Sequence, residues 1–257
     1  MSEDQDWAAV FDQAFAVPAS SVEERIWRDA FGGEYPEGLD TYSYLSRTEL
    51  TRFVAEVNLS AGGLLADIGC GRGGPGVWVI GETGASLVGI DISASALDSA
   101  RTRAASLGLA DRWAWREGSF EATGLEDGSL DAEMSVDALL FTQDKAAAAR
   151  ELARVLRPGG RLVMTTWDYH SQPQGRPPQV GDHRPLLESA GFDVLTYEET
   201  LDWRGRQERT TDGLLAAVDG LAEESGVSRE DLEADLLLMR ANDATITARR
   251  LIVAERR

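Results

Sequence analysis

The sequence is poor in the residues that build several common kinds of site. Its 257 residues include one cysteine, Cys70, and two histidines. A single cysteine excludes an internal disulfide framework and a cysteine-based zinc site, and we expect no metal site at all. No run of residues approaches the roughly 18 apolar positions of a membrane-spanning helix. The N-terminal segment MSEDQDW lacks the basic and apolar regions of a signal peptide, so we expect a soluble, cytoplasmic protein.

Basic side chains are also scarce relative to acidic ones. The chain has 25 Lys and Arg against 44 Asp and Glu, which gives a formal net charge of −19. Nucleic acids and anionic membranes are bound by neutralising phosphate with Lys and Arg, so we expect neither as a partner. A hydrophobic content of 43% is enough for a sizeable core. The length suits one large α/β domain with appendages.

The N-terminal part, residues 1–58, has a helical pattern with two aromatic stripes. Aromatic residues recur every fourth position, at Trp7, Phe11 and Phe15 and again at Trp27, Phe31 and Tyr35. Such spacing places each set on one helix face. A third helix is expected from Tyr44 to Val57. The stripes either pack on the main core, which we favour, or also form a lid over a pocket.

From Gly63 onward, expected strands and helices alternate. The strands are expected at Leu64–Ile68, Leu87–Ile92, Trp113–Glu117, Leu130–Val136, Arg161–Trp167, Phe192–Glu198 and Thr245–Glu255, and helices at Ala94–Leu107, Asp144–Leu156 and His183–Ala190. This alternation predicts βαβ units with a parallel sheet. Residues 206–242 are expected to form two helices before the last strand.

The strongest local signal is a glycine-rich segment that follows the first expected strand. It reads Asp67-Ile68-Gly69-Cys70-Gly71-Arg72-Gly73-Gly74-Pro75-Gly76. Glycines allow a sharp turn and a close approach of backbone to ligand, and Pro75 suits the first turn of a helix. Two registers fit. Gly71-x-Gly73-x-x-Gly76 is the dinucleotide fingerprint, whereas Gly69-x-Gly71-x-Gly73 after Asp67 is typical of S-adenosylmethionine-dependent methyltransferases.

Two carboxylates favour the second register. Asp91 ends the second strand and suits either cofactor, because both offer ribose hydroxyls to a carboxylate. Asp67 discriminates between them, since it would repel a pyrophosphate but accept hydrogen bonds from the ammonium of a methionyl group. A nicotinamide-dependent oxidoreductase is therefore the less favoured reading.

The chain resembles the class I S-adenosylmethionine-dependent methyltransferases of the small-molecule type, such as ubiquinone/menaquinone and natural-product methyltransferases. The motifs that carry the resemblance are the glycine segment, Asp91-Ile92-Ser93, Glu117-Gly118-Ser119-Phe120, Leu125–Asp131, Val155–Leu162 and Ala190-Gly191-Phe192. They cover roughly residues 64–195, and the two ends of the chain match poorly.

The resemblance implies a Rossmann-like, doubly wound, seven-stranded sheet, mostly parallel with an antiparallel last strand. It divides the chain into an N-terminal helical arm or lid (1–58), a cofactor-binding core (59–170) and a C-terminal part (171–257) with a helical insertion at about 206–242. A small-molecule acceptor is implied, S-adenosylhomocysteine is the product of the cofactor, and a homodimer is a possible assembly.

The resemblance also implies roles for particular residues. The expected cofactor-binding residues are Asp67, Gly69, Cys70, Gly71, Gly73, Asp91, Ile92, Ser119, Phe120, Ser135 and Tyr44. Ser119 replaces the Asp that this family usually has, which weakens the expected contact with adenine. Tyr42 is a second candidate beside Tyr44 for the methionyl carboxylate. Cys70 is interpreted as a small spacer.

Methyl transfer needs no fixed catalytic motif, because the sulfonium is already a strong electrophile. A base helps only where the acceptor loses a proton early. The candidate bases are His170, after the fifth strand, and Asp137, at the end of the fourth; His183 is weaker. A methyltransferase-like protein with a non-methylating reaction remains an alternative. A nucleic-acid methyltransferase is disfavoured by the charge and by Ser135-Val136-Asp137-Ala138, where a base-modifying motif would stand.

Overall fold

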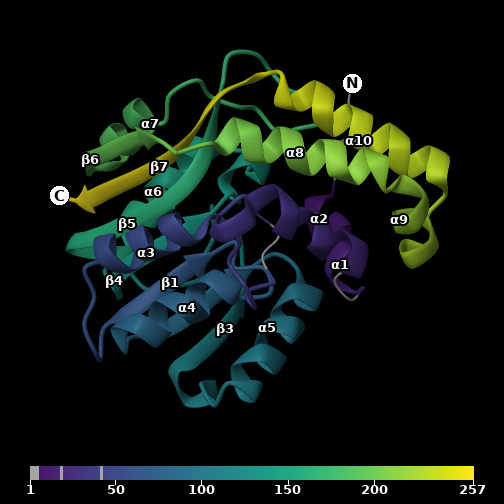
Figure 1. Ribbon diagram of the computed structural model, residues 1–257. Coiled ribbons are helices and arrows are strands. Elements are labelled where there is room, and N and C mark those ends of the chain that lie inside the picture. The colour runs from purple at the N-terminus through teal and green to yellow at the C-terminus, as the bar shows by residue number, and fades with distance from the viewer. Residues whose placement is uncertain (1–5, 18–19, 41–42) are drawn as a thin grey trace.

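Seven strands form one mixed sheet in the computed structural model, which describes residues 6–17, 20–40 and 43–257 (Figure 1). The strands are β1 (Leu64–Ile68), β2 (Ser86–Asp91), β3 (Trp113–Glu117), β4 (Leu130–Val136), β5 (Leu156–Tyr169), β6 (Phe192–Glu199) and β7 (Ile246–Arg256). Their order across the sheet is β3-β2-β1-β4-β5-β7-β6. All seven expected strands are confirmed, and β5 begins five residues earlier than expected, at Leu156 rather than Arg161.

The sheet has the predicted mixture of directions. β1 runs parallel to β2 and β4, and β4 runs parallel to β5. β7 is inserted between β5 and β6 and runs antiparallel to both. The chain leaves β1 toward one edge and later returns to the other side of β1 through β4. Such a reversal leaves a crevice at the carboxyl ends of β1 and β4, where open α/β sheets bind ligands.

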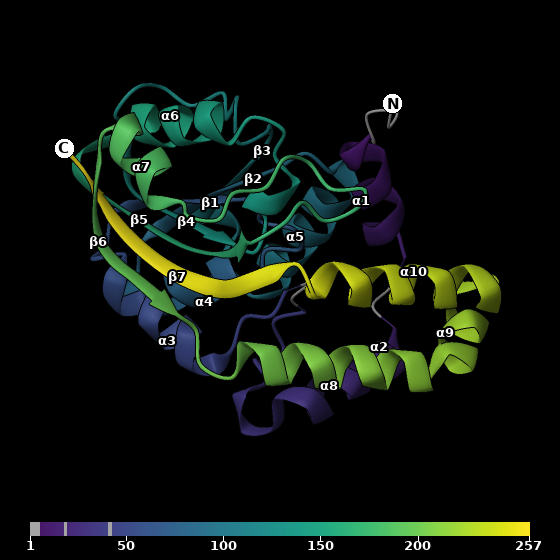
Figure 2. The same cartoon turned by 90° about the horizontal axis from the view of Figure 1, so that it is seen from above.

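Helices cover both faces of the sheet (Figure 2). The helices are α1 (Trp7–Phe15), α2 (Ser21–Phe31), α3 (Arg47–Glu56), α4 (Gly74–Thr83), α5 (Ala94–Ser106), α6 (Lys145–Val155), α7 (Arg184–Ala190), α8 (Trp203–Ala216), α9 (Val218–Ser225) and α10 (Arg229–Asp243). Successive residues of β1 point to opposite faces. Leu65 packs in one core cluster with Phe53 of α3, and Ile68 packs in the other with Leu152 of α6.

The ends of several helices follow from their sequence. Ser46 and Glu49 form a capping box at the start of α3, with each side chain accepting a hydrogen bond from the other residue's backbone N–H. Ser93 caps α5 by accepting a hydrogen bond from Ala96 at 3.1 Å. Pro75 lies in the first turn of α4, as its missing N–H predicts.

The helical insertion differs from expectation. It contains three helices, because the backbone breaks at Ala217 between α8 and α9. The break is at an alanine, between two glycines that both lie inside helices, Gly213 in α8 and Gly220 in α9. Figure 2 shows α8 and α10 side by side and extending beyond the sheet, with α9 joining their far ends. α8 also packs against α2 of the N-terminal arm. In the described part of the chain, no helix combines the length and apolar character that crossing a membrane requires.

One acidic residue lies wholly inside the core. Glu133, on β4, is 0% exposed, and neither of its carboxylate oxygens has a hydrogen-bond partner among the described residues. Burial, with a smaller contribution from the nearby Glu151, raises the pKa of Glu133 well above its ordinary value. The folded protein therefore keeps this side chain protonated at a pH where the unfolded chain would release the proton.

This burial predicts a loss of stability with increasing pH. From about the unfolded pKa of Glu upward, the free energy of unfolding should fall by up to about 1.4 kcal/mol per pH unit through this group, until its folded pKa is reached. Glu133→Gln should remove that decrease, whereas Glu230→Gln, at an exposed position of α10, should not. Urea unfolding between pH 5 and 8 measures the difference. Parallel curves for the wild type and Glu133→Gln would contradict the prediction.

Candidate active site

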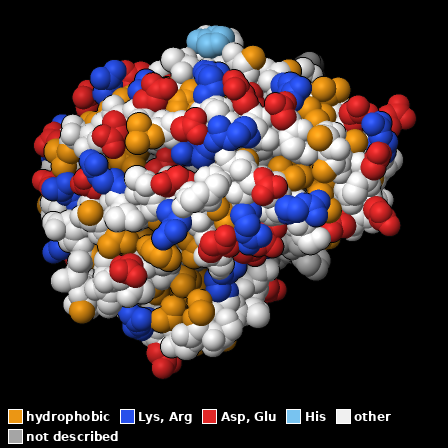
Figure 3. All heavy atoms as spheres, viewed as in Figure 1, with side chains coloured by type: hydrophobic (Ala, Val, Ile, Leu, Met, Phe, Trp, Pro, Cys, Tyr) orange, Lys and Arg blue, Asp and Glu red, His pale blue; other side chains and the backbone are white. Residues whose placement is uncertain are grey.

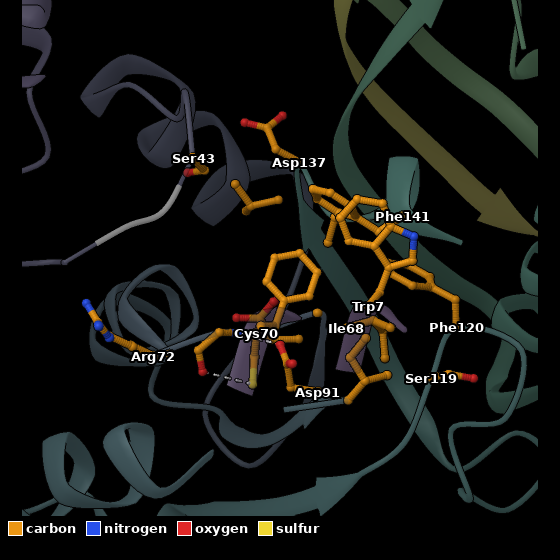
Figure 4. A pocket seen from close by; sticks show the side chains of 18 of the residues that line it. Trp7, Ser43, Ile68, Cys70, Arg72, Asp91, Ser119, Phe120, Asp137 and Phe141 are labelled. Carbon is orange, nitrogen blue, oxygen red and sulfur yellow. Dashed lines mark hydrogen bonds between the residues drawn. The ribbon is translucent and has the colours of Figure 1, made fainter. Parts of the chain in front are cut away.

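A pocket of about 280 Å³ lies at the carboxyl ends of the central strands. It is lined by the glycine segment at the end of β1, by Asp91 and Ile92 at the end of β2, and by residues 118–121 after β3. Residues 136–138 and 141–143, at and after the end of β4, complete this side. Three aromatic side chains of α1 close it from the N-terminal arm. Figure 4 shows Trp7 and Phe141 together on one side of this pocket and Arg72 on the other.

The glycine segment has a backbone that other residues could not adopt without strain. Gly69 has a φ of +72°, and a Cβ built on it would lie 2.5 Å from the Cβ of Ala138. Gly73 has a φ of +75°, and its Cβ would lie 2.3 Å from the ring of Trp113. Both line the pocket, whereas Gly76 is not among the lining residues. This arrangement favours the Gly69-x-Gly71-x-Gly73 register.

Asp91 is held at the edge of the pocket by backbone groups. Its Oδ2 accepts a hydrogen bond from Gly71 N at 2.8 Å, and its Oδ1 accepts one from Ser93 N at 2.9 Å. Burial raises the pKa of Asp91 above its ordinary value, although these two amides oppose the increase. Each carboxylate oxygen keeps further lone-pair capacity, so Asp91 can still accept hydrogen bonds from a ligand.

Asp67 is the unsatisfied acid of the pocket. Its side chain lines the pocket and is almost fully buried, and its Oδ2 has no hydrogen-bond partner among the described residues. Burial, with the nearby negative charge of Asp91, raises the pKa of Asp67 to about 7. An orphaned buried carboxylate of this kind fits a cationic group supplied by a ligand.

The remaining expected cofactor residues divide into two groups. Cys70, Ile92, Ser119 and Phe120 line the pocket. Burial raises the pKa of the Cys70 thiol well above its ordinary value, so the side chain stays a neutral spacer. Ser135 is also fully buried, but it is not among the lining residues, because the pocket meets β4 only at its last residue, Val136, and beyond.

Tyr44 also lies away from the pocket lining. Its ring packs between Trp27, at 4.7 Å, and Trp167, at 5.6 Å between centroids. Its backbone N–H, rather than its hydroxyl, reaches toward the site by donating a hydrogen bond to Asp137. The structure therefore gives no support to Tyr44 as a cofactor ligand. Tyr42, the other candidate of this segment, lies outside the described residues.

The aromatic stripe of α1 lines the pocket, and we call this helix the lid. The sequence left two alternatives for the stripe, packing on the core or also covering a pocket. The ring centroids of Trp7 and Phe11 lie 4.9 and 4.8 Å from that of Phe141. Asp12, on the same helix, anchors this lid to the start of α5: its Oδ1 accepts hydrogen bonds from Ser93 Oγ at 2.7 Å and from the backbone of Ser95. In the second stripe, Phe31 is buried and Trp27 is half-buried, and both rings pack against Tyr44.

Asp137 is neutralised where it stands. Arg249 of β7 is 0% exposed and donates from Nε to Asp137 Oδ1 and from Nη2 to Oδ2, each at 2.9 Å. The same guanidinium donates to Glu49 Oε1 at 2.8 Å, and Arg206 donates to that oxygen at 3.2 Å. Both carboxylate oxygens of Asp137 are thus occupied by buried hydrogen bonds from one guanidinium. The structure therefore does not support Asp137 as a catalytic base.

The two histidines lie outside the pocket lining. His170 is exposed at the end of β5, and its Nε2 lies 3.0 Å from the carbonyl oxygen of Ala244. Because β5 continues to Tyr169, His170 lies beyond the pocket and is not part of its lining. His183 is buried, with its Nδ1 3.0 Å from Asp168 Oδ1. Neither placement supports a histidine base.

The sequence did not single out several residues that the structure brings to the site. Phe141 and Ser43 line the pocket, Asp12 anchors the lid, and Arg249 compensates Asp137. Asp12 could have been found from the sequence, because it lies on the same expected helix as the first aromatic stripe. Arg249 had none, because its partners lie more than 100 residues away in sequence.

Comparison with known proteins agrees with this geometry. Residues 66–164 match the model of a methyltransferase domain family. The matched residues include the glycine segment and Asp91, so this part of the chain resembles a methyltransferase domain. A methyltransferase from Streptomyces halstedii, GfsG, is 33% identical over 149 residues, covering 58% of this chain and 51% of the relative. The chain thus spans about half the length of that relative.

In other comparisons the alignment covers a larger share of both chains. The O-methyltransferase resE from Aspergillus sclerotiorum is 26% identical over 216 residues, covering 77% of this chain and 79% of the relative. Among solved structures, the cyclase SpnF has a TM-score of 0.71 at 22% identity and covers 93% of this chain and 98% of its own. A putative sarcosine dimethylglycine methyltransferase from Galdieria sulphuraria has a TM-score of 0.68 at 19% identity, covering 91% and 97%.

The residues present fit S-adenosylmethionine, the cofactor of this methyltransferase family. The glycine segment leaves a cradle that a Cβ would obstruct, and Asp67 offers an unpaired buried oxygen for an ammonium group. Asp91 offers acceptors for the ribose hydroxyls, and Ile92 and Phe120 offer apolar surface for adenine. We propose these roles for the chain.

Removing the Asp91 carboxylate should weaken S-adenosylmethionine binding by about 100-fold or more, because charge-assisted hydrogen bonds to both ribose hydroxyls would be lost. Gly71→Val should have a similar effect, since Gly71 has a φ of +52° and lies near the ring of Phe15. The measurement is calorimetric titration of Asp91→Ala, with circular dichroism to check folding. Asp98→Ala, at a side chain that is 74% exposed on α5, is the control. Affinity near that of the wild type in Asp91→Ala would show that the site is misplaced.

Cofactor affinity should also depend on pH through Asp67. An ammonium partner requires the ionised carboxylate, and the pKa of Asp67 is about 7. Affinity should therefore increase by up to tenfold per unit as the pH rises toward about 7, and level off above it. Titrations between pH 5.5 and 8, together with Asp67→Asn, test this. A slope that persists unchanged in Asp67→Asn would assign the pH dependence to another group.

Proposed function

We propose that this chain transfers the methyl group of S-adenosylmethionine to an oxygen, nitrogen or carbon atom of a small metabolite. One observation carries the proposal: the glycine segment, its two carboxylates and the aromatic face of α1 line the same pocket. A donor held by the segment and an acceptor held against the rings would therefore meet in one space.

The sulfonium of the cofactor supplies the electrophilic methyl group. The chain's own residues supply binding and orientation: Asp67 and Asp91 hold the polar groups of the cofactor, while Trp7 and Phe11 of α1 cover the pocket and exclude water. None of the described lining residues is a histidine, and Asp137 is paired with Arg249. We therefore propose that proximity and orientation, rather than a histidine base, accelerate the reaction.

The relatives support a small organic acceptor. They include a 27-O-demethylrifamycin SV methyltransferase, 33% identical over 142 residues, and a tocopherol O-methyltransferase, 32% identical over 111 residues. On this basis we propose a role in natural-product biosynthesis. A cytoplasmic location is a separate proposal, which these relatives do not support, since the tocopherol enzyme is chloroplastic. We also propose that the chain forms a homodimer. We further propose that it binds neither a nucleic acid nor a membrane. Figure 3 shows Lys and Arg interspersed with Asp and Glu on the face viewed, which suits a soluble surface more than a phosphate-binding one.

A non-methylating reaction is the alternative. The fold of SpnF, described as a cyclase, is similar along nearly the whole chain, and a shared fold leaves the reaction open. A nicotinamide-dependent oxidoreductase is disfavoured by Asp67, whose buried carboxylate would face a pyrophosphate.

Methyl-labelled cofactor separates the alternatives. We expect the wild type to transfer the label to a compound from a panel of phenols, amines and phosphate esters, as detected by mass spectrometry. Asp91→Ala should lose the transfer, and His170→Ala should retain it, because His170 is exposed outside the pocket. A product that forms without label, with the cofactor unconsumed, would instead indicate the non-methylating reaction.

A further inference from the structure

The part of the pocket not assigned to the cofactor is mostly aromatic. Trp7 and Phe11 of α1 meet Phe141 at ring distances of 4.9 and 4.8 Å, with Phe11 and Phe141 edge to face. Aromatic faces favour apolar, ring-bearing ligands. The uncharged polar side chains on this side are those of Ser43, Thr142 and Gln143.

The charged groups on the acceptor side are already compensated. The only guanidinium among the described lining residues, that of Arg72, donates to Asp40 at 3.1 Å and to the carbonyl of Val17 at 2.7 Å. Asp137 is paired with Arg249, as described above. The unpaired acid, Asp67, lies in the glycine segment on the cofactor side. Glu121, a further lining carboxylate, accepts a hydrogen bond from Asp144 N at 3.4 Å, and its charge acts on the ammonium group of Lys145. An anionic acceptor would therefore find no free counter-charge against the rings.

One further guanidinium lies near the rings. The Arg176 Cζ is 5.2 Å from the ring centroid of Trp7 and 4.7 Å from that of Phe141. Arg176 is not among the lining residues of the pocket. Its positive charge partly opposes the increase that burial causes in the pKa of Asp243. The Arg176 guanidinium makes cation–π contacts with the rings of Trp7 and Phe141, and its side chain is not part of the pocket lining. The undescribed residues 1–5, 18–19 and 41–42 contain no Lys or Arg.

We propose that the methyl acceptor is an uncharged, ring-bearing molecule held by Trp7, Phe11 and Phe141, and that phosphorylated acceptors are excluded. This inference rests on the proposed function, because it assigns the aromatic half of the pocket to the acceptor. Trp7, Phe11 and Phe141 then determine acceptor specificity. Transferring a phosphate group into this half would remove its hydration without supplying a partner.

The test uses three ligands that share a naphthalene ring and differ in charge: one neutral, one anionic and one cationic. Protein saturated with S-adenosylhomocysteine is titrated with 2-naphthol, 2-naphthyl phosphate and 2-naphthylmethylamine by calorimetry. We expect 2-naphthol to bind at least tenfold more tightly than the other two. Trp7→Ala and Phe141→Ala should each weaken naphthol binding by about tenfold. Trp78→Ala, at a partly exposed position of α4 outside the pocket, should leave it unchanged.

A converse variant keeps the proposal falsifiable if the truncations disturb folding. Gln143→Lys, at an exposed lining position, places a free cation on the acceptor side and should raise the affinity for 2-naphthyl phosphate. Equal or tighter binding of the phosphate or the amine by the wild type would overturn the proposal, as would failure of 2-naphthol to bind. If phosphate binding depends on Arg176, Arg176→Ala will abolish it, and the proposal is again wrong. Absence of labelled methyl transfer by the wild type, measured in the separate experiment with labelled cofactor, would count against the proposed function itself.

Discussion

The buried guanidinium of Arg249 is the constraint on which the arrangement around the pocket depends. An unpaired charge at a position that is 0% exposed would cost several kcal/mol. Asp137 at the end of β4 and Glu49 on α3 compensate it, and Arg206 on α8 shares Glu49. The last strand, the N-terminal arm and the helical insertion therefore dock where these charges are paired. This docking fixes one wall of the pocket and occupies both carboxylate oxygens of Asp137 with hydrogen bonds from Arg249.

The lid is held differently. α1 has no buried residue, so little apolar burial fixes it to the rest of the molecule. Its attachments are the aromatic contacts of Trp7 and Phe11 with Phe141 and the hydrogen bonds of Asp12 to the start of α5. Elements with few buried contacts open at low free energy. The helix that supplies the aromatic wall is thus also the element best suited to admit ligands, which links the acceptor surface to the route of entry.

Much of the fold was predictable because it depends on local patterns. The alternation of apolar strands and helices predicted every strand, and the bounds of β1, β3 and β4 match residue for residue. The glycine segment predicted a strand–turn–helix unit because few residues other than glycine adopt its backbone. The sequence predicted two helices in the insertion, yet the structure has three, because the helix breaks at Ala217 and the chain continues through the nearby Gly213 and Gly220 as helix.

The sequence by itself determined one part of the pocket lining: Asp67, Gly69, Gly71, Gly73 and Asp91 lie at strand ends and turns that short-range sterics dictate. Only the tertiary structure decided which distant residues join them. It excluded His170 and Tyr44 from the lining and paired Asp137 with Arg249. It also placed the first aromatic stripe against the pocket and the second beside Tyr44. The physical reason is that charge compensation and ring packing act between residues far apart in sequence, whose positions no local pattern specifies.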